Sequence, residues 1–259
     1  MAELLVVPAI LAYGEAAFAY IGELRGPGVA GRLATWGVRI GWLAQTGLLV
    51  GQALSAEGFA WRTWAGALNF FVWLVVGAYL IWGCRAPFRL LGLVVMPLAA
   101  VLFVVAWLSG GAGDGGGSEL GDIFLAFHVG LILAAFAGFT LAAGLAGLYL
   151  WQERRLKAHA PGVLRQRAPS QAALDALTGR TILVALPALT LGLVVGLARL
   201  GSEGGGFDAV MAVALLTWAA YAAFLVLRYE AGWRGRRTAY LALAAFSLVA
   251  VALVPVTHF

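Results

Sequence analysis

The chain has 259 residues, of which 63% are hydrophobic and only 11% are charged, and its mean hydropathy is +0.93. A soluble fold of this size needs a charged shell, so the composition excludes one and indicates a polytopic α-helical membrane protein. The formal net charge of +5 is a topology signal and no sign of nucleic-acid binding, because the basic residues fall on alternate loops between apolar segments.

Eight segments are long and apolar enough to be membrane spans, since an α-helix needs about 20 mostly apolar residues to cross the hydrocarbon core. They are residues 4–24, 34–54, 64–84, 88–108, 123–151, 180–199, 208–228 and 238–257. Little sequence is left between them. We therefore predict an all-α integral membrane protein, a bundle of eight transmembrane helices that forms a single membrane domain over residues 1–259.

The distribution of Lys and Arg predicts the orientation, because cytoplasmic loops are enriched in both. Of the 17 basic residues, 15 lie in or beside the loops that follow the first, third, fifth and seventh spans, and only Arg62 and Arg199 lie on the other side. We therefore predict that both termini face outward and that the basic loops face the cytoplasm.

Glu15 is the one acidic residue near the middle of a predicted span, where a carboxyl group must be protonated or paired. Arg39 lies at a similar depth in the second span, so we expect a Glu15–Arg39 pair to join the first two helices. Glu15 also supports an alternative function, a transporter for a small molecule that uses a central cavity.

The loops and small residues carry less chemistry. The glycine-rich, acidic loop over 109–122 is expected to be an external connector. The long loop over 152–179 should begin with a continuation of the fifth helix and contain two amphipathic turns at 170–177, capped by Ser170. Its basic residues favour anionic lipid headgroups, and docking of a cytosolic partner is the alternative.

Pairs of small residues four apart occur within the predicted spans. Gly138 with Ala142, and Gly192 with Gly196, predict close helix packing.

Two of the three histidines lie on the predicted outer side. His128 lies five residues into the fifth span, about 8 Å along the helix, and His258 lies at the outer end of the last one. Two imidazoles at one membrane face suit axial ligation of a haem iron. A histidine hydrogen-bonded to a neighbouring helix is the alternative for His128. The single cysteine, Cys84, permits no disulfide within the chain, and no C-x-x-C-H motif is present, so haem would be held non-covalently.

Two segments resemble the cytochrome c assembly membrane proteins, the CcsA/CcmC/HemX superfamily of haem handlers. One runs from Phe127-His128-Val129 to residues 149–157, and these last residues are especially similar to the HemX-type branch. The other runs from residues 216–221 through Gly232-Trp233-Arg234-Gly235-Arg236-Arg237 to His258. The resemblance implies a bacterial cytoplasmic-membrane protein in which His128 and His258 are the axial ligands and thus bind the iron. Phe207 and Asp208 stand where the family has a tryptophan-rich loop over the haem.

The chain departs from the family at two places. Residues 204–208 keep only the aromatic Phe207 and the aspartate of the family's Trp-Gly-x-x-Trp-x-Trp-Asp signature, and Val226 occupies the position of an inner histidine. Both departures disfavour catalytic ligation of haem to apocytochrome, so we do not expect an enzyme.

The residues and the resemblance together predict a protein that holds haem b between His128 and His258, with Phe207 and Asp208 beside it. Its role would be haem handling or transport, cytochrome c assembly or control of haem biosynthesis. The expected partners are haem, the lipid bilayer, and either a cytosolic haem-biosynthesis enzyme or other cytochrome assembly proteins. The alternative is a haem-independent membrane scaffold that regulates such an enzyme, for example glutamyl-tRNA reductase.

Overall fold

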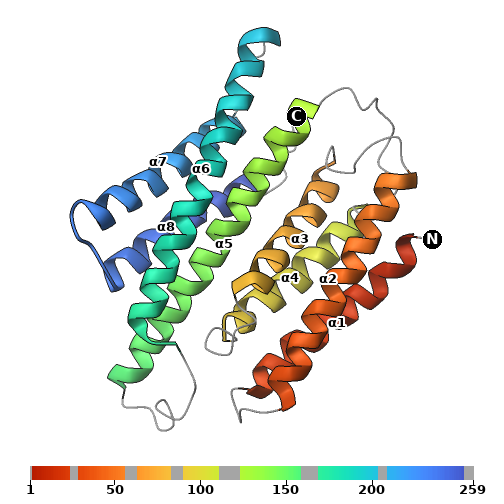
Figure 1. The fold of residues 1–259 in the computed structure, drawn as a ribbon, viewed down its shortest axis with the longest axis horizontal. Coiled ribbons are helices and arrows are strands. Elements are labelled where there is room, and N and C mark those ends of the chain that lie inside the picture. The colour runs from red at the N-terminus through yellow and green to blue at the C-terminus, as the bar shows by residue number, and fades with distance from the viewer. Residues whose placement is uncertain are drawn as a thin grey trace. The chain divides into compact units, whose positions relative to one another are not determined.

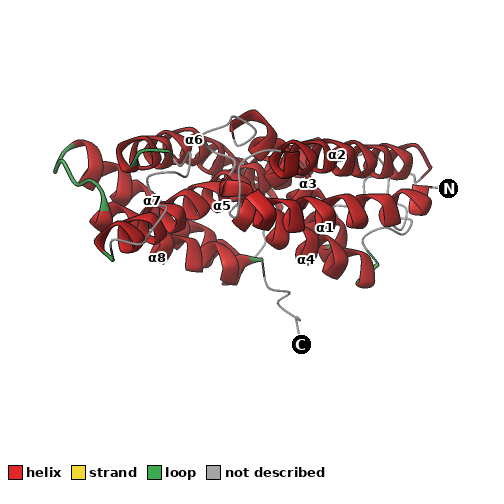
Figure 2. Cartoon of the chain, turned by 90° about the horizontal axis from the view of Figure 1, so that it is seen from below, coloured by secondary structure: helices red, strands yellow, loops and turns green. Residues whose placement is uncertain are grey.

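The computed structural model describes residues 2–23, 29–55, 63–82, 90–110, 123–158, 169–203 and 209–253. Across these residues the secondary structure is entirely helical, with no strand (Figure 2). A short 3-10 helix and eight α-helices follow one another along the chain (Figure 1). They are η1 (Ala2–Leu5), α1 (Val6–Glu23), α2 (Val29–Ser55), α3 (Trp64–Trp82), α4 (Gly92–Leu108), α5 (Ile123–Lys157), α6 (Gln171–Glu203), α7 (Ala209–Tyr229) and α8 (Arg236–Ala252). The all-α class is therefore confirmed, with eight α-helices among the described residues, while the prediction that all eight cross a membrane stays a prediction.

Four of these helices are long and apolar enough to cross a membrane, judged on the described residues by length and composition. They are α3, α5, α6 and α7, while α1 and α4 are shorter apolar helices. Large apolar side chains such as Leu11, Phe18 and Val184 point outward. A surface of this kind suits contact with lipid, since lipid removes the cost of exposing apolar area to water.

Helix α6 is longer than its sequence pattern predicted. The amphipathic turns expected at 170–177 and the span expected at 180–199 form one continuous helix from Gln171. Ser170 caps it as predicted, because the Ala173 N–H donates to Ser170 Oγ at 3.2 Å. Helix α5 also continues through Lys157, which confirms the expected extension past residue 151.

The described helices group into two compact units. Helices η1 and α1–α4 form one, and α5–α8 form the other. In Figure 1 the first is coloured red to yellow and the second green to blue. The single membrane domain expected over residues 1–259 stays a prediction.

The first unit contains a buried line of polar contacts. The Tyr13 hydroxyl donates to Gln45 Oε1 at 2.7 Å, and Gln45 Nε2 donates to Asn69 Oδ1 at 2.8 Å. The hydroxyl of Tyr79 donates to that of Tyr20 at 2.7 Å. Because an apolar interior offers no water, these bonds stabilise one rotation of α1, α2 and α3 against one another.

The predicted Glu15–Arg39 pair is wrong. Both side chains are exposed, and no ion pair joins them in the part of the chain that the structure describes. Arg39 instead lies over the ring of Trp36, with its Cζ 5.3 Å from the centroid. Depth along a helix can be read from sequence, but the rotation of each helix about its axis decides which side chains meet, and α1 turns Glu15 outward beside Leu11 and Phe18.

The second unit is built around α5. Phe139 of α5 stacks on Tyr221 of α7, with ring centroids 3.7 Å apart. A Cβ at Gly138 would stand 2.8 Å from the Cβ of Ala185, so α5 and α6 approach closely there. The close packing predicted for Gly138 is thus confirmed, and α6 lies directly against the helix that carries His128.

Candidate functional site

His128 lies in the second turn of α5 and is half-buried against α6. Its Nδ1 is 2.7 Å from the carbonyl oxygen of Gly192. A carbonyl oxygen only accepts hydrogen bonds, so the ring nitrogen Nδ1 carries the proton and donates it. In the neutral ring, Nε2 then keeps a free lone pair. A backbone carbonyl at Nδ1 is a common second-shell partner of a metal-binding histidine, because it sets both the tautomer and the direction of the ring.

Glycines on α6 make the space for this ring. A Cβ at Gly196 would collide with His128 Cε1 and stand 2.9 Å from Nδ1. A Cβ at Gly192 would stand 2.9 Å from Cγ1 of Ile132, one turn further along α5. The sequence assigned Gly192 and Gly196 to helix packing alone. In the structure they have a second role, which is to seat the imidazole between the two helices.

The remaining residues predicted for the site lie outside the described residues. These are His258, Phe207 and Asp208, and the pairing of His128 with His258 therefore stays a prediction. Of the two outer basic residues, Arg62 also lies outside them, and Arg199 belongs to α6. His128 is thus the one predicted site residue whose side-chain environment is described.

The donor set described around His128 is a single imidazole, which is compatible with axial ligation of a haem iron. No group of three or more His, Cys, Asp or Glu side chains that could hold a metal occurs among the described residues. Haem iron already has four porphyrin nitrogens and takes only one or two axial ligands from the protein. A single imidazole with its Nδ1 proton engaged and its Nε2 lone pair free meets that requirement.

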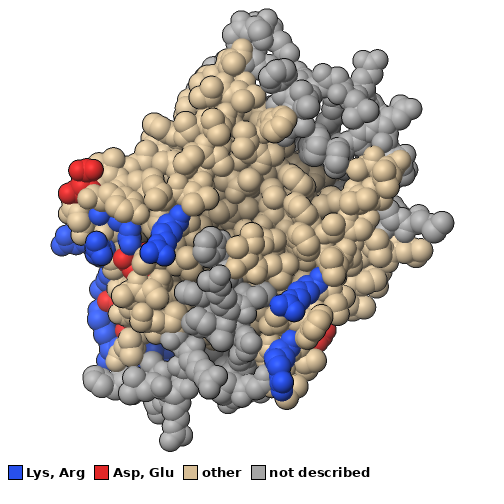
Figure 3. Space-filling view, in the orientation of Figure 1, with Lys and Arg blue, Asp and Glu red and all other residues tan. Residues whose placement is uncertain are grey.

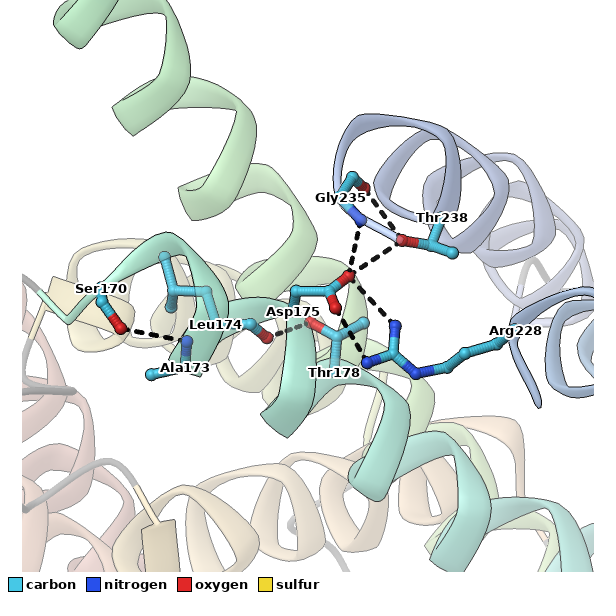
Figure 4. Close-up of polar contacts among 8 residues, drawn as sticks. All are labelled: Ser170, Ala173, Leu174, Asp175, Thr178, Arg228, Gly235 and Thr238. Carbon is cyan, nitrogen blue, oxygen red and sulfur yellow. Dashed lines mark hydrogen bonds and ion pairs between the residues drawn. The ribbon is translucent and has the colours of Figure 1, made fainter. Parts of the chain in front are cut away.

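A second polar centre lies at the other end of the same unit, where α6 begins, α7 ends and α8 begins (Figure 4). Arg228 donates two hydrogen bonds to the Asp175 carboxylate, at 3.0 and 2.9 Å. The Gly235 N–H donates to the same carboxylate at 2.9 Å, and the Thr238 hydroxyl lies 3.0 Å from it. Both charged side chains are nearly buried, 8% exposed for Arg228 and 12% for Asp175.

The sequence patterns predict no role for this ion pair. Asp175 falls in the amphipathic turns predicted at 170–177, and Arg228 is one of the 15 basic residues whose distribution predicts the orientation. The signal that could have indicated the pair is one acid in the first turns of α6 with one base in the last turn of α7. The pair anchors the α7–α8 turn, so it sets where α8 starts and contributes to positioning the last predicted span.

The profile of the family described as Cytochrome C assembly protein matches residues 61–257, which is most of the chain. The chain belongs to the cytochrome c assembly protein family. This match includes His128 and all of α5–α8, and it reaches back through α3 and α4. It therefore extends beyond the C-terminal half in which the sequence segments showed the resemblance. The closer likeness to the HemX-type branch stays a prediction.

Among proteins similar to this member of the family are three named Cytochrome c biogenesis protein CcsA. That of Gloeothece citriformis (strain PCC 7424) is 25% identical over 268 residues, which cover 84% of this chain and 82% of the relative. That of Picosynechococcus sp. (strain ATCC 27264 / PCC 7002 / PR-6) is 25% identical over 301 residues, covering 93% and 87%. That of Prochlorococcus marinus (strain MIT 9312) is 41% identical over 81 residues, which are 30% of this chain and only 26% of the relative. No solved structure matches.

Proposed function

We propose that this protein handles haem during cytochrome c assembly and binds haem b non-covalently through Nε2 of His128. The observation that carries the proposal is the 2.7 Å hydrogen bond from His128 Nδ1 to the Gly192 carbonyl, which leaves Nε2 as the free ligand atom. Membership of the cytochrome c assembly protein family supports the same role. The names of the CcsA relatives, which denote cytochrome c biogenesis, support it further.

His258 is proposed as the second axial ligand, and Phe207 and Asp208 as part of the cover over the site. These three assignments rest on the family resemblance and on the charge pattern, which puts both histidines on one side of the membrane. When bound, haem supplies an iron that two imidazoles can hold in a six-coordinate state. The protein's own contribution is to orient His128 and to bind the porphyrin. We propose a binding and delivery role rather than catalysis of haem ligation.

The proposed topology has eight spans in the bacterial cytoplasmic membrane with both termini outside. The charge asymmetry of the loops supports it, because 15 of the 17 basic residues fall on the predicted inner side. Reporter fusions after residues 60, 86 and 160 would test it: alkaline phosphatase should be active at the first position only. Activity at residue 160 would contradict the proposed orientation of His128.

The haem proposal is tested by the visible spectrum of the protein purified from haem-replete cells. The wild type should show a six-coordinate b-type spectrum in both redox states, and His128→Ala should lose or alter it, as should His258→Ala. His159→Ala is the matched control, since this histidine belongs to the predicted cytoplasmic loop, and it should leave the spectrum unchanged.

One outcome would overturn the haem proposal. A colourless wild-type protein that also fails to take up added haem would leave a haem-independent scaffold as the function to pursue. Control of glutamyl-tRNA reductase that survives loss of both His128 and His258 would point the same way. The transporter alternative would instead be favoured by haem-independent uptake of a small molecule into vesicles that is lost in Glu15→Gln.

A further inference from the structure

Arginines stack on aromatic side chains at the end of the second unit where α5 ends and α8 begins. Stacking fixes the plane of a guanidinium group while its N–H edge stays available for an anion. The pairs, with the distance from Cζ to the ring centroid, are Arg155 over Trp151 at 4.9 Å, Arg236 over Tyr240 at 5.4 Å and Arg237 over Trp233 at 5.8 Å.

Two of the guanidinium groups converge from different helices. Arg236 Nη2, in the first turn of α8, lies 3.4 Å from the hydroxyl of Tyr240. Arg154, in the last turn of α5, acts electrostatically on the same hydroxyl. Arg154 and Arg236 therefore reach the surroundings of Tyr240 from two different helices. Forked donors on two such arginines suit the oxygens of a phosphate group.

The positive charge at this end is not balanced by the acids described near it. The described basic residues there are Arg154, Arg155, Lys157, Arg234, Arg236 and Arg237, beside the acids Glu153 and Glu230. Glu153 is already bonded to Lys157 at 2.6 Å, and Asp175 is engaged by Arg228. Figure 3 shows Lys and Arg side chains gathered over this end of the unit. Their mutual repulsion favours a bound anion.

The surroundings identify the source of the anion. Trp151, Trp233 and Tyr240 are the residue types that mark a membrane–water interface, and α5 and α7, which end beside them, are apolar enough to cross a membrane. We propose that Arg154, Arg155, Arg236 and Arg237, with Tyr240, form an anionic-phospholipid site that holds the headgroup phosphate. We call these five residues the arginine–tyrosine cluster. The site is independent of haem and lies at the end of α5 opposite to His128.

Native mass spectrometry of the full chain tests the proposal directly. The delipidated protein in detergent is titrated with phosphatidylglycerol and, separately, with phosphatidylcholine of the same acyl chains. The wild type should bind phosphatidylglycerol in preference. The double variant Arg154→Gln with Arg236→Gln should weaken that binding roughly 30-fold. Each basic residue near an anionic lipid surface contributes roughly a fivefold gain in affinity, and the double variant removes two of them.

The matched control is Arg32→Gln with Arg39→Gln. It also removes two exposed arginines, one of them stacked on Trp36, but both come from α2. The affinity for phosphatidylglycerol should stay within about twofold of the wild type, which is a small change in binding free energy. An equal loss in this control would overturn the proposal, since any pair of charges would then suffice.

Two further outcomes would overturn it without relying on a variant that folds. Equal affinity of the wild type for both lipids would remove the selectivity for an anionic headgroup. Binding of inorganic phosphate at millimolar concentration, without binding of phosphatidylglycerol, would indicate a soluble phosphate ligand instead. Circular dichroism of each variant checks that its helices are intact.

Discussion

Asp175 and Arg228 are 53 residues apart in the chain, yet their side chains form a bidentate ion pair with N–O distances of 3.0 and 2.9 Å. The pair joins the start of α6 to the end of α7, and the Gly235 N–H adds the turn that begins α8. A Cβ at Gly179 would collide with the Arg228 guanidinium, so only a glycine at this position of α6 leaves space for the Arg228 side chain. Three helix ends therefore depend on one carboxylate.

Replacing Asp175 with Asn should destabilise the protein by about 3–5 kcal/mol, because it leaves Arg228 nearly buried without a counter-charge. The measurement is unfolding in detergent, followed by circular dichroism. The control is Glu153→Gln, which breaks the bond to Lys157, a side chain that is 65% exposed. Exposed pairs contribute little, so this variant should stay near the wild type. Equal effects of the two substitutions would contradict the structural role of Asp175.

Gly235 and Gly232 make a matched pair in the α7–α8 turn, with φ angles of +71° and +68°. An alanine is strained at both positions because of the positive φ, at a cost of about 1–3 kcal/mol. At Gly235 the ψ of −128° also takes the backbone outside the left-handed helical region. Only at Gly235 would the added Cβ meet another group, the Tyr149 hydroxyl at 2.9 Å. Gly235→Ala should therefore lower the melting temperature more than Gly232→Ala. Equal melting temperatures would mean that the contact with Tyr149 is relieved without cost, and the reverse order would contradict the prediction.

Gly196→Ala should weaken haem binding, because its Cβ would collide with the His128 ring and push Nδ1 away from the Gly192 carbonyl. Overpacking of this kind typically costs about 1–3 kcal/mol. Haem titration followed at the Soret band gives the affinity. Gly130→Ala is the control on α5, since a Cβ there meets nothing within 4 Å. Unchanged haem affinity in Gly196→Ala would mean that haem binding does not depend on the position of the His128 ring.

Gln45→Leu should destabilise the first unit by about 0.6–1.7 kcal/mol, the range typical of hydrogen bonds between membrane helices. It removes the acceptor of the Tyr13 hydroxyl and the donor to Asn69. The comparison is Glu15→Gln, whose side chain is exposed and lacks an ion pair among the described residues. Thermal unfolding of Glu15→Gln should match the wild type. A loss of stability in Glu15→Gln would contradict this prediction, because it would mean that the Glu15 carboxylate makes a stabilising contact.

Much of the fold and part of the site could be predicted from the sequence. The position of α5 from Ile123 onward, its extension to Lys157 and the cap at Ser170 all agreed with the structure. His128 was singled out because a polar ring inside an apolar span needs a partner. The Glu15–Arg39 pair failed, since equal depth in two helices does not make two side chains face each other.

The sequence by itself determined the helices and singled out His128 as a candidate site residue. A chain in lipid must satisfy its backbone within each helix, so every predicted span is visible as a local apolar run. Only the tertiary structure decided which atoms meet. His128 with Gly192 and Asp175 with Arg228 lie 64 and 53 residues apart, and both contacts depend on how each helix is rotated about its axis. Helices that are apolar on nearly every face carry no local pattern that sets that rotation.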